Sequence, residues 1–210
     1  MARTAPFDNF SADYEAWFEQ HPEVYAAEVE AVRRLLPPFE KGIEIGVGSG
    51  RFSLPFGIRE GIEPSEKMAE IARKKGIKTL YGVAEALPLA DASYDLALMV
   101  TTICFVDDAL QSLNEICRIL QPDGYVIIGF VDRASKIGHA YERHRKESRF
   151  YGEATFYTAQ EVRRLLEEAG FGDISCVQTI FGDSLQDADT SIREGCGEGA
   201  FVAMRAQKRD

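Results

Sequence analysis

The chain alternates between short apolar runs and segments in which apolar residues recur every three or four positions. The apolar runs predict strands near residues 42–46, 58–63 and 77–82. The segments with helical spacing predict helices near residues 50–56 and 65–75. Strands that alternate with helices in this way predict an α/β fold built on a parallel sheet.

Two longer apolar runs follow, over residues 96–100 and 125–131. A strand that is apolar throughout is typical of the centre of a parallel sheet, because both of its faces are covered there. We therefore expect both runs to form central strands. A helix over residues 107–120 is predicted to connect them.

The last third of the chain predicts one more helix and two more strands. Thr158 is a favourable N-cap, and Glu161 stands three residues later, which is the capping-box pattern for a helix that reaches Ala169. Residues 174–181 and 200–206 are expected to close the sheet as an antiparallel pair.

The first 38 residues carry aromatic and aliphatic side chains at helical spacing, and this region ends at Pro37 and Pro38. We interpret residues 1–38 as an N-terminal helical cover on a main domain over residues 39–210. The polar stretch 132–155 is predicted to be an insert in this domain that forms a lid over the substrate.

Length and charge limit the class of protein. A chain of 210 residues, of which 45% are hydrophobic, suffices for one domain with a sizeable core. The formal net charge of −10 disfavours a general nucleic-acid binder, because basic surfaces supply most of the affinity for phosphate backbones. We expect a small-molecule partner and no nucleic acid, and the sequence leaves monomer and homodimer open.

The cysteines and the N-terminus predict neither a metal site nor a membrane segment. The 4 cysteines form no Cys-x-x-Cys pair and no metal-ligand spacing with the 3 histidines, so buried free thiols are the simplest interpretation. The N-terminus lacks an apolar signal region, and no stretch approaches the length of a membrane span. These features predict a cytoplasmic protein.

The segment from Gly42 to Gly50 carries the most specific motif. Gly46, Gly48 and Gly50 stand at alternate positions directly after a predicted strand. Glycine tolerates positive φ and lets backbone approach a ligand closely, as nucleotide-like cofactors require. The dinucleotide fingerprint needs its third glycine at the position of Arg51, so NAD and FAD are disfavoured.

Two acids accompany this motif. Glu44 precedes its first glycine by two residues, and Glu63 stands at the end of the next predicted strand. A carboxylate in that place can accept hydrogen bonds from both hydroxyls of a ribose.

A Glu-x-Gly-x-Gly-x-Gly motif followed by a strand-terminal acid resembles the class I methyltransferases that use S-adenosylmethionine. Four later segments recur in that family's order, at residues 84–89, 93–100, 118–124 and 165–171. The resemblance implies a Rossmann-like, mostly parallel seven-stranded sheet of order 3-2-1-4-5-7-6, with the last strand antiparallel and helices on both faces. It also implies S-adenosylmethionine as cofactor and S-adenosylhomocysteine as product.

The same resemblance implies a role for each motif. Backbone around Gly46, Gly48 and Gly50 would lie beside the methionine portion and the ribose. Glu44 would hold the methionine ammonium group directly or through water. Glu63 would bind the ribose hydroxyls.

The adenine site departs from the family pattern, because Val83 stands where an aspartate is common. The amide of Ala84 remains available to adenine, and Glu85 either replaces the missing carboxylate or faces solvent. Thr101 and Thr102 follow a predicted strand at the edge where cofactor and acceptor meet. Their hydroxyls either line the methionine end or satisfy the backbone of a turn.

Four residues are candidates for the acceptor site. Tyr14 and Trp17 belong to the N-terminal helical region, and His139 and Tyr141 belong to the insert. The aromatic residues would otherwise form a packing stripe, and the histidine would otherwise be a surface residue. The insert is also rich in Arg and Lys, which would attract an anionic acceptor or simply lie in solvent.

Methyl transfer from a sulfonium is an in-line displacement that depends mainly on aligning the reactants and excluding water. It requires no catalytic triad or metal motif, and the sequence shows neither, so the catalytic residues stay unassigned. The sequence predicts S-adenosylmethionine-dependent methyl transfer to a small molecule. The alternative is a module that binds S-adenosylmethionine without turnover, which the missing adenine aspartate favours.

Overall fold

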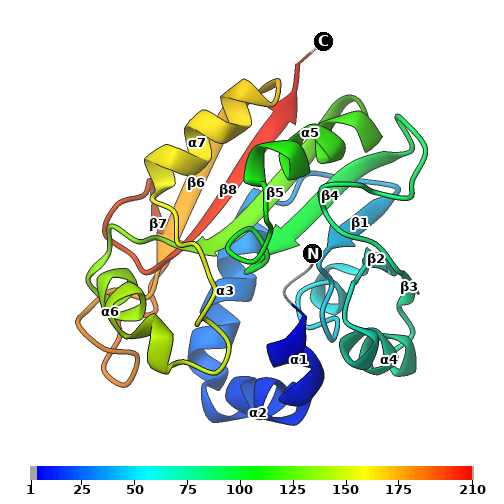
Figure 1. Ribbon diagram of the computed structural model, residues 1–210. Helices are drawn as coiled ribbons and strands as arrows, with labels where there is room; N and C mark the ends of the chain where they lie inside the picture. The colour runs from blue at the N-terminus through cyan, green and yellow to red at the C-terminus, as the bar shows by residue number, and fades with distance from the viewer. Residues whose placement is uncertain (1–3, 210) are drawn as a thin grey trace.

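The computed structural model describes residues 4–209, which form three layers around one central sheet (Figure 1). Within this range, eight strands lie side by side in the order β3-β2-β1-β4-β5-β8-β6-β7. Their bounds are β1 (Gly42–Ile45), β2 (Glu60–Ile62), β3 (Lys78–Leu80), β4 (Tyr94–Val100), β5 (Leu120–Val131), β6 (Phe171–Thr179), β7 (Arg193–Glu194) and β8 (Phe201–Lys208).

Strands β1 to β5 are parallel, and β8 is antiparallel to both of its neighbours. Leu98 of β4 lies opposite Ile127 of β5, and Ile128 of β5 lies opposite Met204 of β8. These four side chains are fully buried, as expected for central strands that are covered on both faces. The carboxyl ends of β1, β2, β4 and β5 therefore meet at one edge of the sheet.

Helices α5 and α7 cover one face of the sheet and α3 covers the other (Figure 1). Leu113 of α5 and Val162 of α7 belong to the core of the first face, whereas Val32 of α3 belongs to the core of the second. The bounds of the helices are α1 (Ala5–Asn9), α2 (Ser11–Gln20), α3 (Pro22–Leu35), α4 (Glu66–Lys74), α5 (Ala109–Ile119), α6 (Lys136–His144) and α7 (Ala159–Glu168), with short 3-10 helices η1 (Leu54–Phe56) and η2 (Arg145–Glu147).

The strand order expected from the resemblance is confirmed, with one strand more than expected. The additional strand is β7, a two-residue segment that pairs with Val177 and Gln178 at the edge of the sheet. The predicted capping box is also confirmed. The hydroxyl of Thr158 accepts a hydrogen bond from the amide of Glu161 at 3.2 Å, and the Glu161 carboxylate accepts one from the Thr158 amide at 2.7 Å.

The helix predicted near residues 50–56 is wrong. This segment contains turns and the three-residue helix η1. Pro55 lacks the backbone N–H that a longer helix would use, and Gly57 follows in a left-handed conformation with φ of 76°. The apolar spacing instead reflects Phe52 and Phe56, which are buried under α3 without a helix between them.

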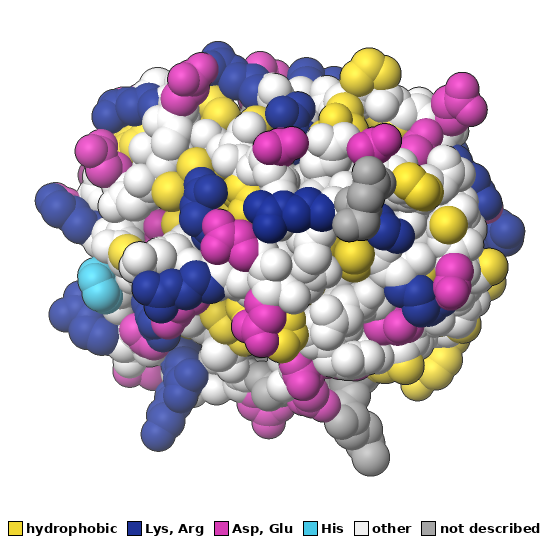
Figure 2. Space-filling model, turned by 90° about the horizontal axis from the view of Figure 1, so that it is seen from above, with side chains coloured by type: hydrophobic (Ala, Val, Ile, Leu, Met, Phe, Trp, Pro, Cys, Tyr) yellow, Lys and Arg dark blue, Asp and Glu magenta, His cyan; other side chains and the backbone are white. Residues whose placement is uncertain are grey.

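The surface at the end of the molecule that faces upward in Figure 1 carries acidic and basic side chains side by side (Figure 2). No continuous basic area is visible on that face, in keeping with the net charge of −10. Among residues 4–209, none of the helices combines the length and the apolar character that crossing a lipid bilayer would require.

Candidate functional site

The glycine motif forms a loop at the carboxyl end of β1. Gly46 and Gly48 adopt positive φ values of 71° and 54°. A Cβ atom on Gly46 would lie 2.4 Å from Cγ2 of Thr102, so no other residue fits there without displacing the end of β4. The loop therefore presents bare backbone at the edge of the sheet where β1 and β4 end.

Glu63 fixes this loop to the end of β2. Its carboxylate accepts a hydrogen bond from the Gly48 amide at 2.7 Å and another from the Ser65 amide at 2.8 Å. Only 8% of the residue is exposed, and this burial raises the pKa of the carboxyl group to about 7, although the two amides oppose the shift. A carboxylate has about four lone-pair sites, so two remain for a ligand.

Glu44 lies in β1, directly before the loop. It is 1% exposed, and its carboxylate accepts a hydrogen bond from the hydroxyl of Ser53. Burial raises the pKa of Glu44 to about 8, with the Ser53 hydrogen bond opposing the shift and the negative charge of Glu63 adding to it. Glu44 thus ties β1 to the segment that follows the glycine loop.

The end of β4 is strained at the same edge. Thr101 has a φ of 51°, and its amide donates to the carbonyl oxygen of Gly129 at 2.7 Å. Ile180, at the end of β6, has a φ of 65°. A positive φ costs a β-branched residue about 1 to 3 kcal/mol, and such strain concentrates at ligand sites.

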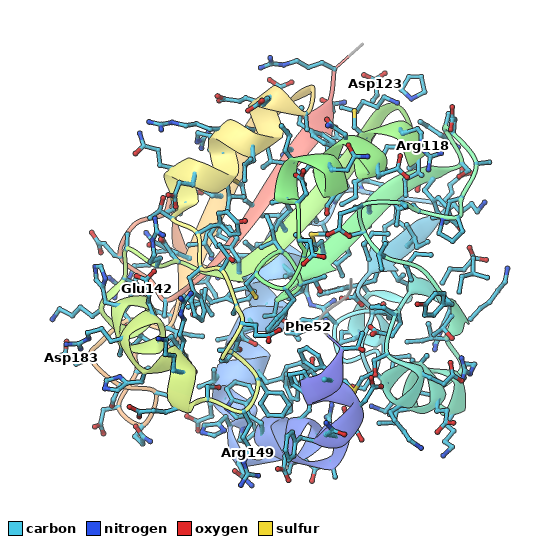
Figure 3. The ribbon with its side chains drawn as sticks, in the orientation of Figure 1. Phe52, Arg118, Asp123, Glu142, Arg149 and Asp183 are labelled. Atoms are coloured by element: carbon cyan, nitrogen blue, oxygen red, sulfur yellow. The ribbon has the colours of Figure 1, made fainter. Side chains whose placement is uncertain are left out.

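A cavity of about 300 Å³ opens beside these elements. Gly46, Gly48 and Glu63 line one end of it, and Thr101 and Ile180 belong to its wall. Much of the remaining wall is aromatic, with rings from the N-terminal helices, the segment before η1, the β4–α5 loop and residues 132–155. The aromatic residues of the wall include Tyr14, Trp17, Phe52, Phe105, Tyr141 and Tyr151, of which Phe52 is labelled near the centre of Figure 3.

The N-terminal helices cover the glycine-loop end of the cavity and are bound to it by two acids. Glu15 of α2 accepts hydrogen bonds from the hydroxyl of Ser49, from Arg51 and, at 2.8 Å, from Lys75. These bonds lower the pKa of Glu15 in spite of its partial burial. Asp8 of α1 adds a bond from the Ser65 hydroxyl at 2.6 Å.

Residues 132–155 close the other side of the cavity against the same cover. Phe7 of α1 packs edge-on against Phe105 at 5.0 Å between ring centroids and lies 5.8 Å from Phe150. Arg149 pairs with Asp13 of α2 at 2.7 Å, at the edge of the molecule where α2 lies in Figure 3. Aromatic packing and one ion pair thus join two segments that are far apart in the sequence.

Comparison with known proteins identifies the family of this chain. A profile for a methyltransferase domain matches residues 43–128. A solved structure from Thermotoga maritima, described as a SAM-dependent methyltransferase and possible histamine N-methyltransferase, is 48% identical with a TM-score of 0.92, and the match covers 98% of this chain and 99% of that one. The chain belongs to the class I S-adenosylmethionine-dependent methyltransferases.

Two curated relatives also match this chain. An uncharacterized protein of Methanocaldococcus jannaschii is 40% identical, and the match covers 96% of this chain and 98% of the relative. A demethylmenaquinone methyltransferase of Staphylococcus aureus is 26% identical over 162 residues, which cover 62% of this chain and 67% of that protein. The fold is therefore that of a methyltransferase.

The site residues expected from the methyltransferase pattern fall into two groups. Gly46, Gly48, Glu63, Thr101 and Thr102 line the cavity, whereas Glu44 and Gly50 are not among its lining residues. The hydroxyl of Thr102 donates to the backbone carbonyls of Val100 at 3.1 Å and Gly46 at 3.3 Å, so it satisfies the turn while its residue forms part of the wall.

Ala84 and Glu85 do not line the cavity. Ala84 belongs to the core, and the carboxylate of Glu85 accepts a hydrogen bond from the Asp107 amide at 2.6 Å, which ties it to the start of α5. Their roles in adenine binding stay predictions.

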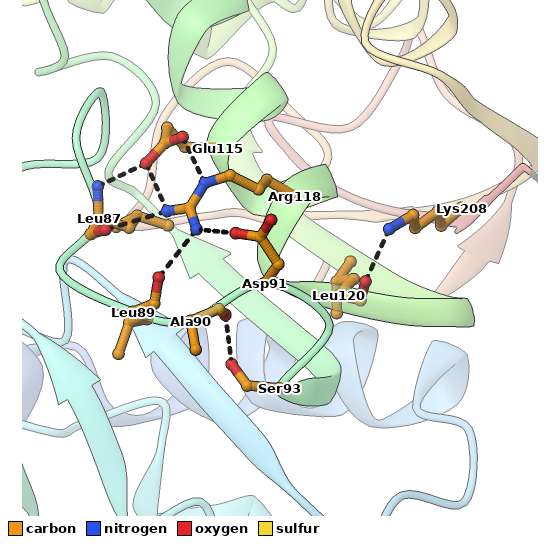
Figure 4. A network of polar contacts seen from close by, with 9 residues as sticks. All are labelled: Leu87, Leu89, Ala90, Asp91, Ser93, Glu115, Arg118, Leu120 and Lys208. Carbon is orange, nitrogen blue, oxygen red and sulfur yellow. Dashed lines mark hydrogen bonds and ion pairs between the residues drawn. The ribbon is translucent and has the colours of Figure 1, made fainter.

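The loop that carries Ala84 and Glu85 is held by a network of polar contacts around Arg118 (Figure 4). The guanidinium donates to Glu115 at 2.7 Å and to the carbonyl of Leu89 at 2.8 Å, and it pairs with Asp91 at 2.6 Å. Glu115 in turn accepts from the Leu87 amide at 2.7 Å. The segment over residues 84–93 is therefore fixed to α5.

Three of the four acceptor-site candidates line the cavity, namely Tyr14, Trp17 and Tyr141. His139 is exposed and is not among the lining residues, so the structure does not bring it together with the other three. The basic side chains of the insert also lie elsewhere, for example Lys136, which pairs with Asp183 at 2.7 Å on the outer surface.

One charged residue that lines the cavity was not among the site residues predicted from the sequence. Glu28 of α3 is 7% exposed and faces the cavity, and burial alone raises its pKa to about 8. The available signal was its spacing from Val24 and Ala31, which places it on the apolar stripe of the helix. An acid on such a stripe is unusual enough to mark a site.

Proposed function

We propose that this protein transfers the methyl group of S-adenosylmethionine to a small-molecule acceptor inside the cavity. The observation that carries the proposal is the junction of two surfaces in one cavity, the glycine loop with Glu63 and an aromatic wall. A volume of about 300 Å³ lies within the range of small-ligand pockets. A macromolecular acceptor would have to insert a single group past the N-terminal helices.

The residues at the glycine-loop end fit the cofactor. Gly46 and Gly48 offer backbone without side chains beside the methionine portion and the ribose, and Glu63 retains lone pairs for the ribose hydroxyls. Glu44 acts on the methionine ammonium group through water, since it is not among the residues that line the cavity. Ala84 and Glu85 remain the candidates for adenine.

The chain itself has to align the methyl donor with the acceptor and to exclude water from the site. When bound, S-adenosylmethionine supplies a methyl carbon that is already activated by the positively charged sulfur. The apolar and aromatic wall keeps water from this carbon, and the ends of β4 and β6, strained at Thr101 and Ile180, define where the acceptor approaches. Residues 132–155 contribute Tyr141 and Tyr151 to the acceptor side.

The named relatives favour a small acceptor. The 48% identical Thermotoga maritima structure is described as a possible histamine N-methyltransferase, and the more distant Staphylococcus aureus relative as a demethylmenaquinone methyltransferase. Both descriptions concern low-molecular-weight acceptors. They support the small-molecule class for this chain without specifying the compound.

Titration calorimetry followed by a transfer assay tests the proposal. S-adenosylmethionine should bind, whereas NAD should not. Incubation with S-adenosylmethionine labelled in its methyl group and a small-metabolite extract should then yield a labelled product, which mass spectrometry identifies. Tight binding without any labelled product would favour the module that binds the cofactor without turnover. No binding at millimolar S-adenosylmethionine would contradict both functions.

A further inference from the structure

Glu28 lies on the face of α3 whose other members are apolar side chains. The buried residues of this helix recur at the spacing of one face and pack against β5, β6 and β8. Glu28 shares this face and is 7% exposed. The other members of the face are Val24, Ala27, Ala31, Val32 and Leu35.

Within residues 4–209, the carboxylate of Glu28 has no hydrogen-bond or ion-pair partner, and its side chain lines the cavity. Glu63 and Glu44 are buried to a similar extent, but each accepts at least one hydrogen bond from the chain. A buried carboxylate without partners is costly, because an unsatisfied charged group loses its hydration. Such a group remains in a folded protein most readily where a ligand supplies the missing partner.

The surroundings of Glu28 define the charge of that ligand. Among residues 4–209, no Lys, Arg or His side chain lines the cavity, whose charged groups are Glu28 and Glu63. The negative charge of Glu28 contributes to the raised pKa values of Tyr14, Tyr141 and Tyr151, after the larger effect of their own burial. The cavity therefore has a negative potential and aromatic walls, a combination that attracts a cation.

None of the basic residues of the insert lines the cavity. Arg133 pairs with Glu161 at 2.7 Å, Lys136 with Asp183 at 2.7 Å, and Arg149 with an acid of α2. Each of these pairs lies outside the lining. An anionic acceptor would thus meet two carboxylates and no positive charge.

We propose, on the basis of the function proposed above, that Glu28 binds the nitrogen of a basic amine on an aromatic or apolar body and accepts a proton from it. The nitrogen enters as an ammonium group. One N–H bond breaks, its proton forms an O–H bond with a carboxylate oxygen of Glu28, and its electron pair remains on nitrogen. The neutral amine then holds the lone pair that methylation requires, and Glu28 later releases the proton to water.

The properties of Glu28 suit both parts of this role. Its pKa of about 8 lies near the pH at which it works, as an efficient general base requires. The isolated carboxylate also offers all of its lone pairs to the ammonium group. Aromatic rings from α2, α6 and the segment after η2 surround the cation on the remaining sides.

The experiment uses three probes that share one ring and differ in charge, namely phenethylamine, 2-phenylethanol and phenylacetate. Trp17 is the single tryptophan of the chain and lines the cavity, so its fluorescence reports binding without turnover. The titrations are made at pH 8 with saturating S-adenosylhomocysteine. Phenethylamine should bind at least about tenfold more tightly than either other probe, as expected for a hydrogen bond to a charged group.

The variant is Glu28→Gln, which keeps the size of the side chain. Glu30→Gln on the exposed side of the same helix is the matched control, because Glu30 forms only surface pairs with Arg33 and Arg34. Glu28→Gln should lose at least about tenfold of the phenethylamine affinity and keep its affinity for 2-phenylethanol. The control should behave as wild type.

The pH dependence gives a second test. Phenethylamine affinity for wild type should rise from pH 5 to pH 8 as Glu28 ionises, and Glu28→Gln should remove most of that rise. The tyrosines near Glu28, namely Tyr14, Tyr25, Tyr141 and Tyr151, stay neutral over this range because their pKa values are raised above 10. Glu63, the other acid of the cavity, has a pKa raised by burial to about 7 and ionises in the same range, so the part of the rise that Glu28→Gln retains measures its contribution.

Equal affinity of wild type for the three probes, or no binding of phenethylamine at ten millimolar, would overturn the assignment. Unchanged phenethylamine affinity in Glu28→Gln would also overturn it. Failure of wild type to bind S-adenosylhomocysteine would instead contradict the function on which the assignment rests. Methyl transfer to a labelled acceptor that lacks nitrogen would contradict the assignment alone.

Discussion

The two ends of the cavity each contain a buried glutamate, and the two are held in opposite ways. Glu63 is 8% exposed and is fixed by two backbone amides, at 2.7 Å and 2.8 Å. Glu28 is 7% exposed and has no partner within the described chain. The first acid is positioned before any ligand arrives, whereas the second depends on a ligand to neutralise it.

This difference separates the general part of the site from the specific part. Glu63 stands at a strand end beside the glycine loop, where the fold itself sets its place and the family's common cofactor is expected. Glu28 stands on a helix that covers the sheet, where the fold requires only apolar contact. A charged residue in such a place points to the substrate of this chain and not to the architecture.

The rigidity of the glycine-loop end is tested by Gly46→Ala, for which we expect the largest effect. A left-handed backbone costs alanine about 1 to 2 kcal/mol, and the clash with Thr102 adds about 1 to 3 kcal/mol of overpacking. Gly57→Ala is the matched control, since Gly57 has a φ of 76° but no atom within 4 Å of a new Cβ.

Urea denaturation should therefore show a greater loss of unfolding free energy for Gly46→Ala than for Gly57→Ala. Equal losses would mean that the contact between the loop and β4 is not tight.

The substitution Glu63→Ala tests the contribution of Glu63 to cofactor binding. Losing hydrogen bonds to a charged group should weaken S-adenosylmethionine binding by about 1 to 3 kcal/mol, which titration calorimetry measures. Glu66→Ala, an exposed acid at the start of α4, serves as the control and should bind normally. Unchanged affinity in Glu63→Ala would remove this residue from the ribose site.

The unpartnered state of Glu28 predicts a pH-dependent stability of the ligand-free protein. Its pKa is about 8 in the folded chain and 4.5 as an ordinary glutamate, so the folded state retains a proton that the unfolded state releases between these values. The contribution of Glu28 to the free energy of unfolding is therefore fully present below pH 4.5 and is lost as the pH rises through 8.

Glu28→Gln should therefore be more stable than wild type at pH 8, by about 1.4 kcal/mol for each unit by which the folded protein raises the pKa of Glu28, and little different at pH 5. For a chain of this size each kcal/mol corresponds to a rise in Tm of about 2 to 4 °C. Thermal melts at both pH values measure it. An equal difference in Tm between the variant and wild type at both pH values would show that Glu28 does not ionise between pH 5 and pH 8.

The smallest expected effect concerns the cover. Glu15→Gln removes the charge that holds α2 to Arg51 and Lys75, and it should weaken cofactor binding by about 1 kcal/mol. Glu19→Gln, one turn later, removes an exposed acid at 3.6 Å from Arg51 and should have almost no effect. If calorimetry gave the same cofactor affinity for both variants, the attachment of the N-terminal helices would not depend on Glu15.

The sequence predicted the elements whose signals are local. Alternating apolar runs gave the strands, Thr158 and Glu161 gave a helix start, and the strand order followed from the family resemblance. The helix over residues 50–56 was wrong, because apolar spacing alone does not distinguish a helix from turns that bury Phe52 and Phe56.

The parts of the site that the sequence missed depend on tertiary contacts. Glu15 gains its role only when α2 lies over Ser49 and Lys75, which follow it by 34 and 60 positions. Glu28 looks like an ordinary helix glutamate until α3 is placed against the sheet. Tyr14, Trp17 and Tyr141 were identifiable as aromatic residues in covering segments, but His139 has the same sequence context and lies at the surface.

A crystal structure with bound S-adenosylhomocysteine tests the central claim most directly, because that claim is a place for the cofactor. We predict density in the cavity, with both ribose hydroxyls within about 3 Å of the Glu63 carboxylate and the amino acid portion beside Gly46. Density for the ligand at another surface, or a ribose that does not contact Glu63, would contradict the account.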